Sequence, residues 1–302
     1  MTPKVTIGIC VKNCEDYLTR TIDSVLEQTF PRKHMELIFV DDGSKDKTLE
    51  IIQGYIPKIK IAAKVFHTSW KGLGHARNIV VANASGKYVL WVDGDMFLSK
   101  DYVKTLVEFM EKYPKIGIAK GKQSLQSAAD SLSTLETYSR AASRMVNYQS
   151  EEARSKTLGT GGSIYRIEAI KQVGGFAEDL RGYGEDWDLE IRVRDAGWSL
   201  FTVDAEFFDY EWLGLTWSNL WRKYFIRGYY SHYFLHKNSG LLKHYRMFPV
   251  AAFVAGFLSS SKLFRLTSRK LAFLLPIEQF FKTMAWYVGF IKSHLNSYEP
   301  DN

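Results

Sequence analysis

The segment Tyr88-Val89-Leu90-Trp91-Val92-Asp93-Gly94-Asp95 places five mostly β-forming apolar residues directly before an acidic turn. A continuous apolar run of this length is typical of a strand that is buried on both faces, as in a parallel sheet. The two carboxylates would then lie at the carboxyl edge of that sheet, where open α/β folds bind ligands. Because like charges so close repel each other, we expect a cation between them, most simply Mg²⁺ or Mn²⁺ holding phosphate oxygens. The alternative is an ordinary Asx turn with Gly94 in a left-handed conformation.

Strands and helices alternate through the first hundred residues. Apolar runs predict strands at about residues 5–11, 36–40, 59–67 and 88–92, and helical spacing predicts helices at about 15–28, from 46 onward and at 72–84. Short connections between such elements favour an α/β fold with a mostly parallel sheet flanked by helices. Because Asp41 and Asp42 end the second strand, we expect them to face the same crevice as Asp93 and Asp95.

The rest of the chain extends this pattern less regularly. We expect a helix at 101–112, strands at 116–120 and 200–203, and a second helix that starts at 184–188 and ends near 196. Residues 122–156 are polar with helical spacing, and 159–166 contain a glycine-rich turn that enters a strand.

The composition limits the class of protein. At 302 residues the chain can form one large domain, or one domain with an appendage. Its only cysteines, Cys10 and Cys14, lie close together in the first strand region, which indicates neither a disulfide framework nor a zinc site and fits a reducing compartment. The first residues lack the charge and apolar pattern of a signal peptide, so we expect none.

The positive charge belongs to one C-terminal segment. Residues 221–292 contain twelve Lys or Arg and one acid, Glu278, whereas residues 1–220 contain 28 Lys or Arg and 30 acids. A basic, aromatic segment on a near-neutral body predicts an anionic surface as partner. No nucleic-acid-binding motif accompanies the charge, so we expect a membrane surface and no nucleic acid.

Five short motifs follow one another in a fixed order along residues 4–230. They are Gln28-Thr29-Phe30 with Asp41-Asp42-Gly43-Ser44, then Ala76-Arg77-Asn78, Asp93-Gly94-Asp95, Gly174-Gly175-Phe176, and Gly184-Glu185-Asp186-Trp187-Asp188 with Arg192. Together they resemble the family 2 glycosyltransferases, which have the GT-A fold. The resemblance implies an inverting enzyme that uses a nucleotide-diphosphate sugar and a divalent metal, Mn²⁺ or Mg²⁺.

The resemblance also implies roles for individual residues. Asp186 would be the general base, with Glu185 beside it, and Asp95 would ligate the metal together with Asp93. Many members complete the metal shell with a histidine after the last strand of the sheet; this chain has none there, and Asp209 or Glu211 could replace it. The nucleotide-sugar would be bound by Cys10, Lys12, Asp42, Arg77, Asp93 and Gly94.

The proposed chemistry explains why these residue types are needed. A metal neutralises the charge that develops on the departing diphosphate, and a carboxylate accepts the proton of the attacking hydroxyl. The alternative for Asp186 is an N-terminal helix acid without a catalytic role, with Asp188 and Arg192 as an i,i+4 surface pair. Contacts to the acceptor or the diphosphate are expected from Gly161, Gly162, Trp187, Arg222 and Lys223.

The C-terminal segment contains three apolar runs, at residues 247–258, 271–277 and 284–291. A membrane-spanning helix needs about 20 apolar residues, and these runs are shorter and contain Pro249 and Pro276. We therefore expect amphipathic helices in the membrane interface, with lysines and arginines at anionic headgroups. The alternative is that these helices pack on the catalytic domain or form a dimer interface.

These observations predict a catalytic domain at residues 1–215, with its nucleotide-sugar part at about 1–98 and its acceptor part at 99–215, followed by a basic helical appendage at 216–302. The expected reaction moves one sugar from a UDP- or GDP-sugar to a membrane-associated, polyprenyl-linked or glycan acceptor at the cytoplasmic face of the cell membrane, with the enzyme bound peripherally or monotopically. A polyprenyl-phosphate sugar synthase is the alternative enzyme. A catalytically silent, membrane-bound scaffold that retains the fold is the alternative of another class.

Overall fold

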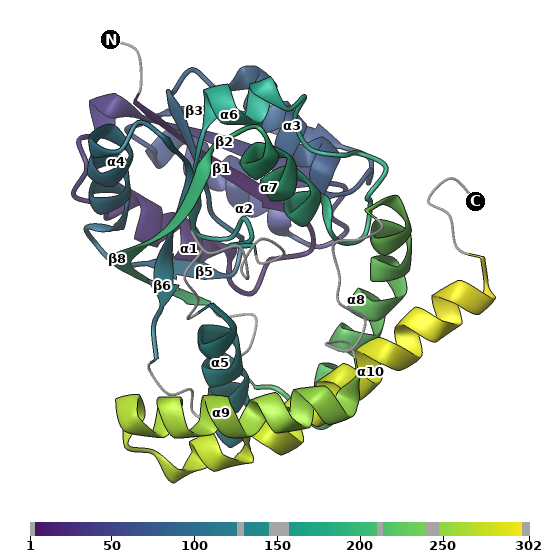
Figure 1. The fold of residues 1–302 in the computed structure, drawn as a ribbon. Coiled ribbons are helices and arrows are strands. Elements are labelled where there is room, and N and C mark those ends of the chain that lie inside the picture. Colours follow the sequence, from purple (N-terminus) through teal and green to yellow (C-terminus); the bar gives the residue numbers. More distant parts are fainter. Residues whose placement is uncertain (1–3, 126–129, 145–156, 210–213, 239–247, 298–302) are drawn as a thin grey trace. The chain divides into compact units, whose positions relative to one another are not determined.

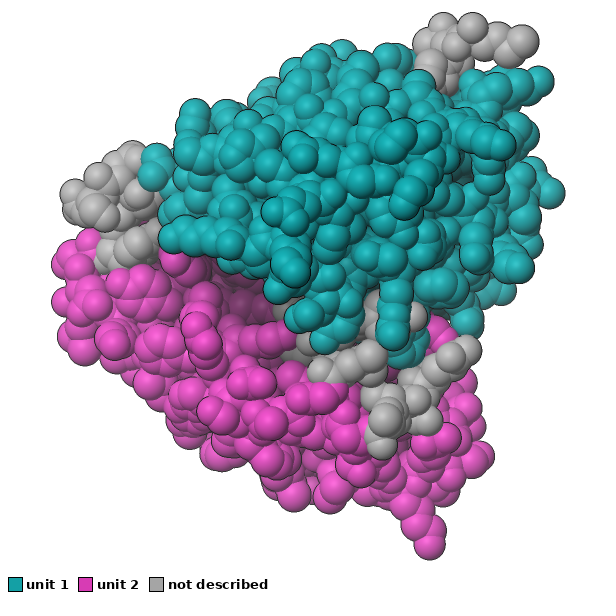
Figure 2. Space-filling view, turned by 180° about the vertical axis from the view of Figure 1, so that it is seen from behind, with its two compact units in different colours: residues 1–122, 147–181, 185–211 teal, residues 123–146, 182–184, 212–302 magenta. Residues whose placement is uncertain are grey.

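The computed structural model describes residues 4–125, 130–144, 157–209, 214–238 and 248–297 (Figure 1). The chain divides into two compact units, coloured separately in Figure 2. The first unit comprises residues 1–122, 147–181 and 185–211, and the second comprises residues 123–146, 182–184 and 212–302. The boundary predicted between residues 215 and 216 stays a prediction.

Within the described residues, eight strands form one sheet in the order β3-β2-β1-β4-β7-β6-β8-β5. The first four strands in this order are parallel, whereas β7 pairs antiparallel with β4 and β6, and β5 pairs antiparallel with β8. The predicted mostly parallel α/β sheet is therefore confirmed. The strands are β1 (Val5–Val11), β2 (Met35–Asp42), β3 (Ala62–Thr68), β4 (Tyr88–Trp91), β5 (Met96–Leu98), β6 (Ile116–Gln123), β7 (Ser163–Arg166) and β8 (Ser199–Asp209).

The helices of the first unit lie between these strands in the sequence. They are α1 (Leu18–Leu26), α2 (Thr48–Tyr55), α3 (Leu73–Asn83), α4 (Tyr102–Lys112), α6 (Ile167–Gln172) and α7 (Glu185–Asp195), with the 3₁₀ turns η1 (Arg32–His34) and η2 (Ile56–Lys58). The largest difference from the sequence prediction is β8, which continues to Asp209 rather than ending at 203. Residues 203–209 of β8 alternate between buried and more exposed positions. The apolar run at residues 200–203, from which the strand was predicted, did not reveal this continuation.

Two apolar layers cover the sheet. On one face, β1 residues Val5, Ile7 and Ile9 pack with apolar residues of α1, α2 and α4 in a single core cluster. On the other face, Gly8 leaves room for the ring of Trp91 and for Val80 of α3. The alternation of β1 side chains between two apolar layers explains why the strand is almost continuously apolar.

The second unit is helical in its described parts. It contains α5 (Ser131–Arg144), α8 (Trp217–Lys237), α9 (Pro249–Thr267), η6 (Lys270–Leu274) and α10 (Leu275–Leu295). Helix α10 packs along both α8 and α9 (Figure 1). A side-chain carbon added at Gly228 would lie 1.9 Å from the carbonyl oxygen of Trp286, and one at Gly289 would lie 2.1 Å from that of Phe225. Glycines therefore allow α8 and α10 to approach backbone to backbone.

The expectation that prolines interrupt the C-terminal apolar runs is wrong. Pro249 and Pro276 lie in the first turns of α9 and α10, where a missing N–H costs no hydrogen bond. As a result, α9 is a continuous helix of 19 residues that is long and apolar enough to cross a membrane by length and composition, with 17% of its apolar window buried. Length and composition of a single helix are weak evidence for a membrane span.

Gly8 gives a test of the packing on the sheet. A methyl group at Gly8 would lie 2.8 Å from both Trp91 and Val80, so we expect Gly8→Ala to destabilise the fold by about 1–3 kcal/mol through overpacking. The matched control is Gly54→Ala in α2, where nothing lies within 4 Å and alanine should stabilise the helix by about 0.5–1 kcal/mol. Urea unfolding of the two variants measures both changes, and equal midpoints would contradict the packing.

Candidate active site

The Asp93-Gly94-Asp95 turn connects β4 to β5 and is held against the first helix. The Thr21 hydroxyl of α1 donates a hydrogen bond of 2.8 Å to the Gly94 carbonyl. A side-chain carbon at Gly94 would lie 2.6 Å from the Cys14 sulfur. Gly94 does not have a positive φ angle, so the left-handed turn considered above does not form. Glycine is required here for close packing, and that packing fixes the backbone between the two partly exposed carboxylates.

A third carboxylate lies beside this turn. In the antiparallel pair of β5 and β8, Asp209 is directly opposite Met96, the residue after Asp95. Asp209 is buried, at 7% exposure. The pairing therefore brings the backbone of a third acid to the end of the acidic turn, and carboxylate oxygens are ligands that Mg²⁺ and Mn²⁺ prefer. Glu211, the other candidate ligand, lies outside the described residues.

A glycine loop at residues 159–162 lies next to these acids. A side-chain carbon at Gly161 would lie 2.2 Å from a carboxylate oxygen of Asp93. The Gly162 amide donates a 2.9 Å hydrogen bond to the Trp91 carbonyl at the end of β4, and the Tyr102 hydroxyl donates a 2.5 Å bond to the Gly162 carbonyl. The loop is thus fastened to the sheet at the point where the acidic turn begins.

The same loop contacts the other candidate catalytic carboxylate. Asp186 lies in the first turn of α7, and its carboxylate is 3.5 Å from the position of a side-chain carbon on Gly159. Lys120 of β6 is buried and donates to the carbonyls of Leu158 at 2.8 Å and Gly159 at 3.3 Å. Sequence reasoning did not select Lys120. A lysine at the end of the predicted strand 116–120, which is otherwise apolar or glycine, was the signal that could have identified it.

A buried ion pair joins α3 to α7. Arg77 and Glu185 are in direct contact, with side chains that are each 6% exposed. Burial raises the pKa of Glu185 to about 7, against the lowering effect of Arg77. Burial also opposes the charge of Arg77, but Glu185 and then Asp186 raise its pKa. These two residues therefore hold the start of α7, next to Asp186, and the expected nucleotide contact of Arg77 stays a prediction.

Two further motif residues anchor the turn before α7. The Asn78 amide donates to the Phe176 carbonyl at 3.0 Å, and its oxygen accepts from the Phe176 amide at 2.9 Å. Arg192 pairs with buried Asp188 and donates a 2.8 Å bond to the Gly175 carbonyl. Asp188 and Arg192 thus form the i,i+4 pair that the alternative interpretation predicted. This pair is not confined to the surface, because Arg192 also binds the glycine turn and so connects that turn to α7.

The predicted nucleotide-binding residues lie at the ends of β1 and β2. Buried Asp42 accepts hydrogen bonds from the amides of Lys71 and Gly72, at 3.0 and 3.1 Å, and so orders the loop after β3. Trp70 on that loop is 48% exposed, and the Lys12 ammonium lies 4.5 Å from its ring centre. Trp70 was missed because a lone tryptophan in a polar loop carries no periodic signal.

Both cysteines are thiols. Burial raises the pKa of Cys10 to about 12, with Arg77 opposing it and Asp93 adding to it. Burial and then Asp95 raise the pKa of Cys14 to about 12. Because the thiolate is the nucleophilic form, neither cysteine is suited to covalent catalysis.

The remaining predicted contacts are placed on helices. Trp187 is partly buried in the first turn of α7. Arg222 is exposed and Lys223 partly buried on α8, in the second unit. Their contacts with acceptor or diphosphate stay predictions.

Glu190 is a buried acid that sequence reasoning did not find. It accepts hydrogen bonds from the Tyr165 hydroxyl at 2.7 Å and from the Leu158 amide at 2.6 Å. Burial and then Asp186 raise its pKa to about 7. Glu190 thus connects α7 to β7 and to the residue before the glycine loop.

Comparisons with known proteins agree on the family. The sequence model of the protein family described as "Glycosyl transferase family 2" matches residues 6–173 of the chain. The chain is 32% identical over 110 residues to the poly(ribitol-phosphate) beta-N-acetylglucosaminyltransferase TarS of Staphylococcus aureus, covering 36% of this chain and 19% of that protein. It is 35% identical over 99 residues to the poly(ribitol-phosphate) beta-glucosyltransferase of Bacillus spizizenii, covering 32% and 16%. The aligned part thus spans under a fifth of these curated relatives.

Solved structures show the same fold over nearly the whole chain. S. aureus TarS 1–349 in complex with UDP-GlcNAc has a TM-score of 0.54 at 18% identity and covers 98% of this chain and 93% of its own. The mannosyltransferase PcManGT from Pyrobaculum calidifontis, in complex with GDP-Man and Mn²⁺, has a TM-score of 0.66 at 17% identity, covering 99% and 89%. Identities this low support the fold alone.

The raised pKa of Glu190 predicts a pH dependence of stability. A carboxyl group whose pKa is higher in the folded than in the unfolded state stabilises the fold below the unfolded value of about 4.5, and this stability is lost as pH rises through about 7. We therefore expect the free energy of unfolding to fall between pH 5 and pH 7.5. Glu190→Gln should remove the contribution of at most one proton from the slope of unfolding free energy against pH. Part of the slope should remain, because Glu185 titrates in the same range. Urea unfolding across this range measures the slope, and an unchanged slope in Glu190→Gln would contradict the assignment.

Proposed function

The chain belongs to glycosyl transferase family 2, and on that basis we propose that it transfers a single sugar from a UDP- or GDP-sugar to a membrane-associated acceptor, with inversion at the sugar carbon. The observation that carries this proposal is the glycine loop at residues 159–162. Gly161 lies against Asp93 and Gly159 against Asp186. Gly159 and Gly161 are two residues apart, and two residues span at most about 7 Å. One short loop therefore lies beside both Asp93, a proposed metal ligand, and Asp186, the proposed base.

Asp95 and Asp93, with Asp209 beside them, would hold Mn²⁺ or Mg²⁺ at the end of β4. The fit rests on the donor chemistry, because Asp93 and Asp95 are partly exposed at the end of β4 and the backbone of Asp209 pairs with Met96, the residue after the turn. A bound divalent metal would stabilise the charge on the departing diphosphate as a Lewis acid. The fixed backbone at Gly94 presents Asp93 and Asp95 in one orientation, which favours binding because little side-chain freedom is lost.

Asp186 would accept the proton of the attacking acceptor hydroxyl. It lies in the first turn of α7, and its carboxylate is 3.5 Å from the position of a side-chain carbon on Gly159, at the glycine loop. The Arg77–Glu185 pair and the Lys120 contacts would position Asp186 and the glycine loop. With both thiols protonated, we propose a single displacement without a covalent enzyme intermediate.

The nucleotide would bind where Asp42 orders the loop after β3. The exposed ring of Trp70, with Lys12 above it, offers an aromatic face and a cation for a base and a phosphate. Two structural neighbours, whose names include UDP-GlcNAc and GDP-Man, are consistent with either nucleotide.

The acceptor would lie at a membrane surface, because the second unit carries a large apolar surface. Exposed side chains on α9 recur at helical spacing, as Val250, Val254, Phe257 and Leu258, each at least 56% exposed. Exposed Lys262 and Arg265 follow on the same helix. Apolar exposure of this extent with flanking cations fits an interface with anionic lipid. We propose peripheral or monotopic attachment at the cytoplasmic face.

Donor binding is the first experiment for the function as a whole. We expect UDP or GDP, or one of their sugar conjugates, to raise the melting temperature with Mn²⁺ and to have no such effect with EDTA. Metal-dependent stabilisation by one nucleotide supports the transferase. Folded protein that responds to none of them supports a catalytically silent scaffold.

Two substitutions separate metal binding from proton transfer. Asp95→Asn should abolish the metal-dependent stabilisation by the donor, because it removes the proposed ligand. Asp186→Asn should retain that stabilisation but lower the rate of transfer about 10²–10⁴-fold, the usual contribution of a general base. Thermal shift and a single-turnover transfer assay distinguish the two. Asp186→Asn with full activity would fit a polyprenyl-phosphate sugar synthase, in which an ionised phosphate needs no base.

Membrane attachment has its own test. Leu258 on α9 is 76% exposed, and Leu258→Asp should weaken binding to phosphatidylglycerol vesicles at least tenfold, because it removes an apolar contact and adds a negative charge. Gln53→Glu, on an exposed position of α2, adds the same charge and should bind as the parent does. Cosedimentation measures both, and equal binding of the two variants would exclude α9 as the attachment site.

A further inference from the structure

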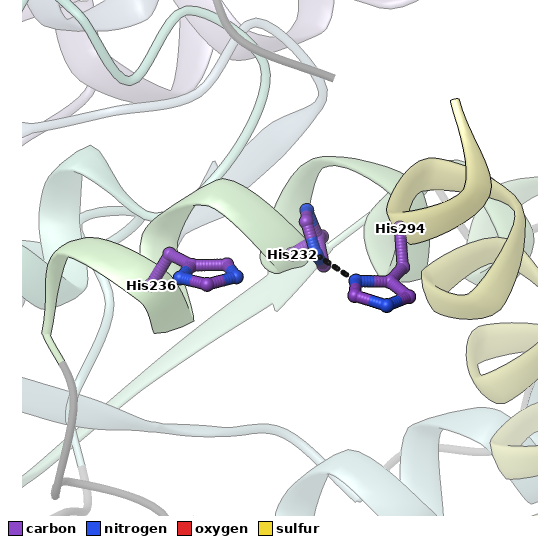
Figure 3. Close-up of side chains that lie close together, drawn as sticks. All are labelled: His232, His236 and His294. Carbon is purple, nitrogen blue, oxygen red and sulfur yellow. Dashed lines mark hydrogen bonds between the residues drawn. The ribbon is translucent and has the colours of Figure 1, made fainter. Parts of the chain in front are cut away.

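Three histidines of the second unit come together at one end of the α8–α10 pair. His232 and His236 are four residues apart on α8 and share a helix face, and His294 lies in the last turn of α10. Their ligand atoms all lie within 4.8 Å of one another. Figure 3 shows the three imidazoles converging from the two helices. This cluster has no part in the sugar transfer proposed above.

The distances suit a metal ion. The Nε2 atom of His232 and the Nδ1 atom of His294 are 3.1 Å apart. With zinc–nitrogen bonds of about 2.0–2.1 Å in a tetrahedral site, two ligand nitrogens are separated by roughly 3.3 Å. These two nitrogens therefore already have the separation of two ligands of one ion. His236 is exposed and needs only a side-chain adjustment, since its ring centre is 5.0 Å from that of His232.

The environment of His232 supports the same conclusion. His232 is 6% exposed and its ring lies against Phe290, at 5.1 Å between centres. Its Nδ1 atom is buried without a hydrogen-bond partner, so Nε2, which faces His294, is the nitrogen that an ion in the cluster would bind.

The helices that carry the cluster are held rigidly. Gly228 and Gly289 bring the backbones of α8 and α10 together. The Trp286 indole also donates a 3.3 Å hydrogen bond to Ser231, the residue before His232. Ligands on rigid, closely packed helices lose little freedom when an ion binds.

We propose that His232, His236 and His294 bind a Zn²⁺ ion that clamps the C-terminal ends of α8 and α10. Three neutral imidazoles favour Zn²⁺ over the Mg²⁺ or Mn²⁺ expected at the carboxylates of the first unit. Three protein ligands leave one position for water. The ion adds a link between two helices that pack against each other and share the Trp286–Ser231 hydrogen bond, so it stabilises the second unit.

The test uses the full, tag-free chain carrying Asp95→Asn, which removes the main ligand of the acidic site. After treatment with EDTA and buffer exchange, Zn²⁺ binding is measured by competition with a chromophoric chelator, and the melting temperature is measured with and without Zn²⁺. We expect one Zn²⁺ per chain and a higher melting temperature. Co²⁺ in place of Zn²⁺ should give the visible absorption of a tetrahedral site.

His236→Asn and His294→Asn, both at exposed positions, should each weaken Zn²⁺ binding at least tenfold and remove the thermal shift. His75→Asn changes a histidine of the first unit, on α3, and should bind as its parent does. Circular dichroism without metal establishes that each variant is folded. The proposal would be overturned if the parent did not bind Zn²⁺, or if His236→Asn and His294→Asn bound Zn²⁺ as tightly as the parent. It would also be overturned if His75→Asn weakened Zn²⁺ binding as much as they do.

Discussion

The ion pair between Arg77 and Glu185 is the interaction on which the arrangement of the candidate site depends. It joins α3, which follows the loop proposed to bind the nucleotide, to the first residue of α7, which precedes Asp186. Both partners are almost inaccessible to water, so loss of either would leave an unpaired buried charge, at a cost of about 3–5 kcal/mol. A buried pair of this kind adds little to stability compared with an apolar pair, but it permits only one position of α7. Its role here is to place the helix that carries the proposed base.

Several motif residues act in the same way. Asn78 holds Phe176, and Asp188 with Arg192 holds the glycine turn before α7. Gly94, Gly161 and Gly162 are needed because carboxylates, side chains or backbone occupy the space of a side-chain carbon. The motifs that reveal the family in the sequence are therefore largely the contacts that bring separate segments to one sheet edge. The groups proposed for chemistry, Asp95 and Asp186, are a minority among them.

This explains what the sequence could predict. The alternation of apolar strands and amphipathic helices is local, so the parallel half of the sheet and its acidic ends were predictable from periodicity. The opposition of Asp209 to Met96 depends on an antiparallel pairing across more than a hundred residues, and no local pattern specifies it. Glu190 was missed for the same reason, because only its partners in the fold distinguish it from a surface charge. The prolines of α9 and α10 were misjudged because a proline in the first helical turn looks, in sequence, like an interruption.

The second unit reverses the usual distribution of charge and apolar surface. Glu136, Glu278 and Lys282 are buried together, with the Lys282 ammonium 2.9 Å from each carboxylate. Burial raises the pKa of Glu278, whereas Lys282, acting against burial, lowers that of Glu136 to about 2. Meanwhile Val254 and Leu258 are exposed. A helical unit with paired charges inside and an apolar helix face outside is more stable when that face is away from water. This is the physical reason why a lipid interface, rather than an aqueous surface, is the environment proposed for the acceptor.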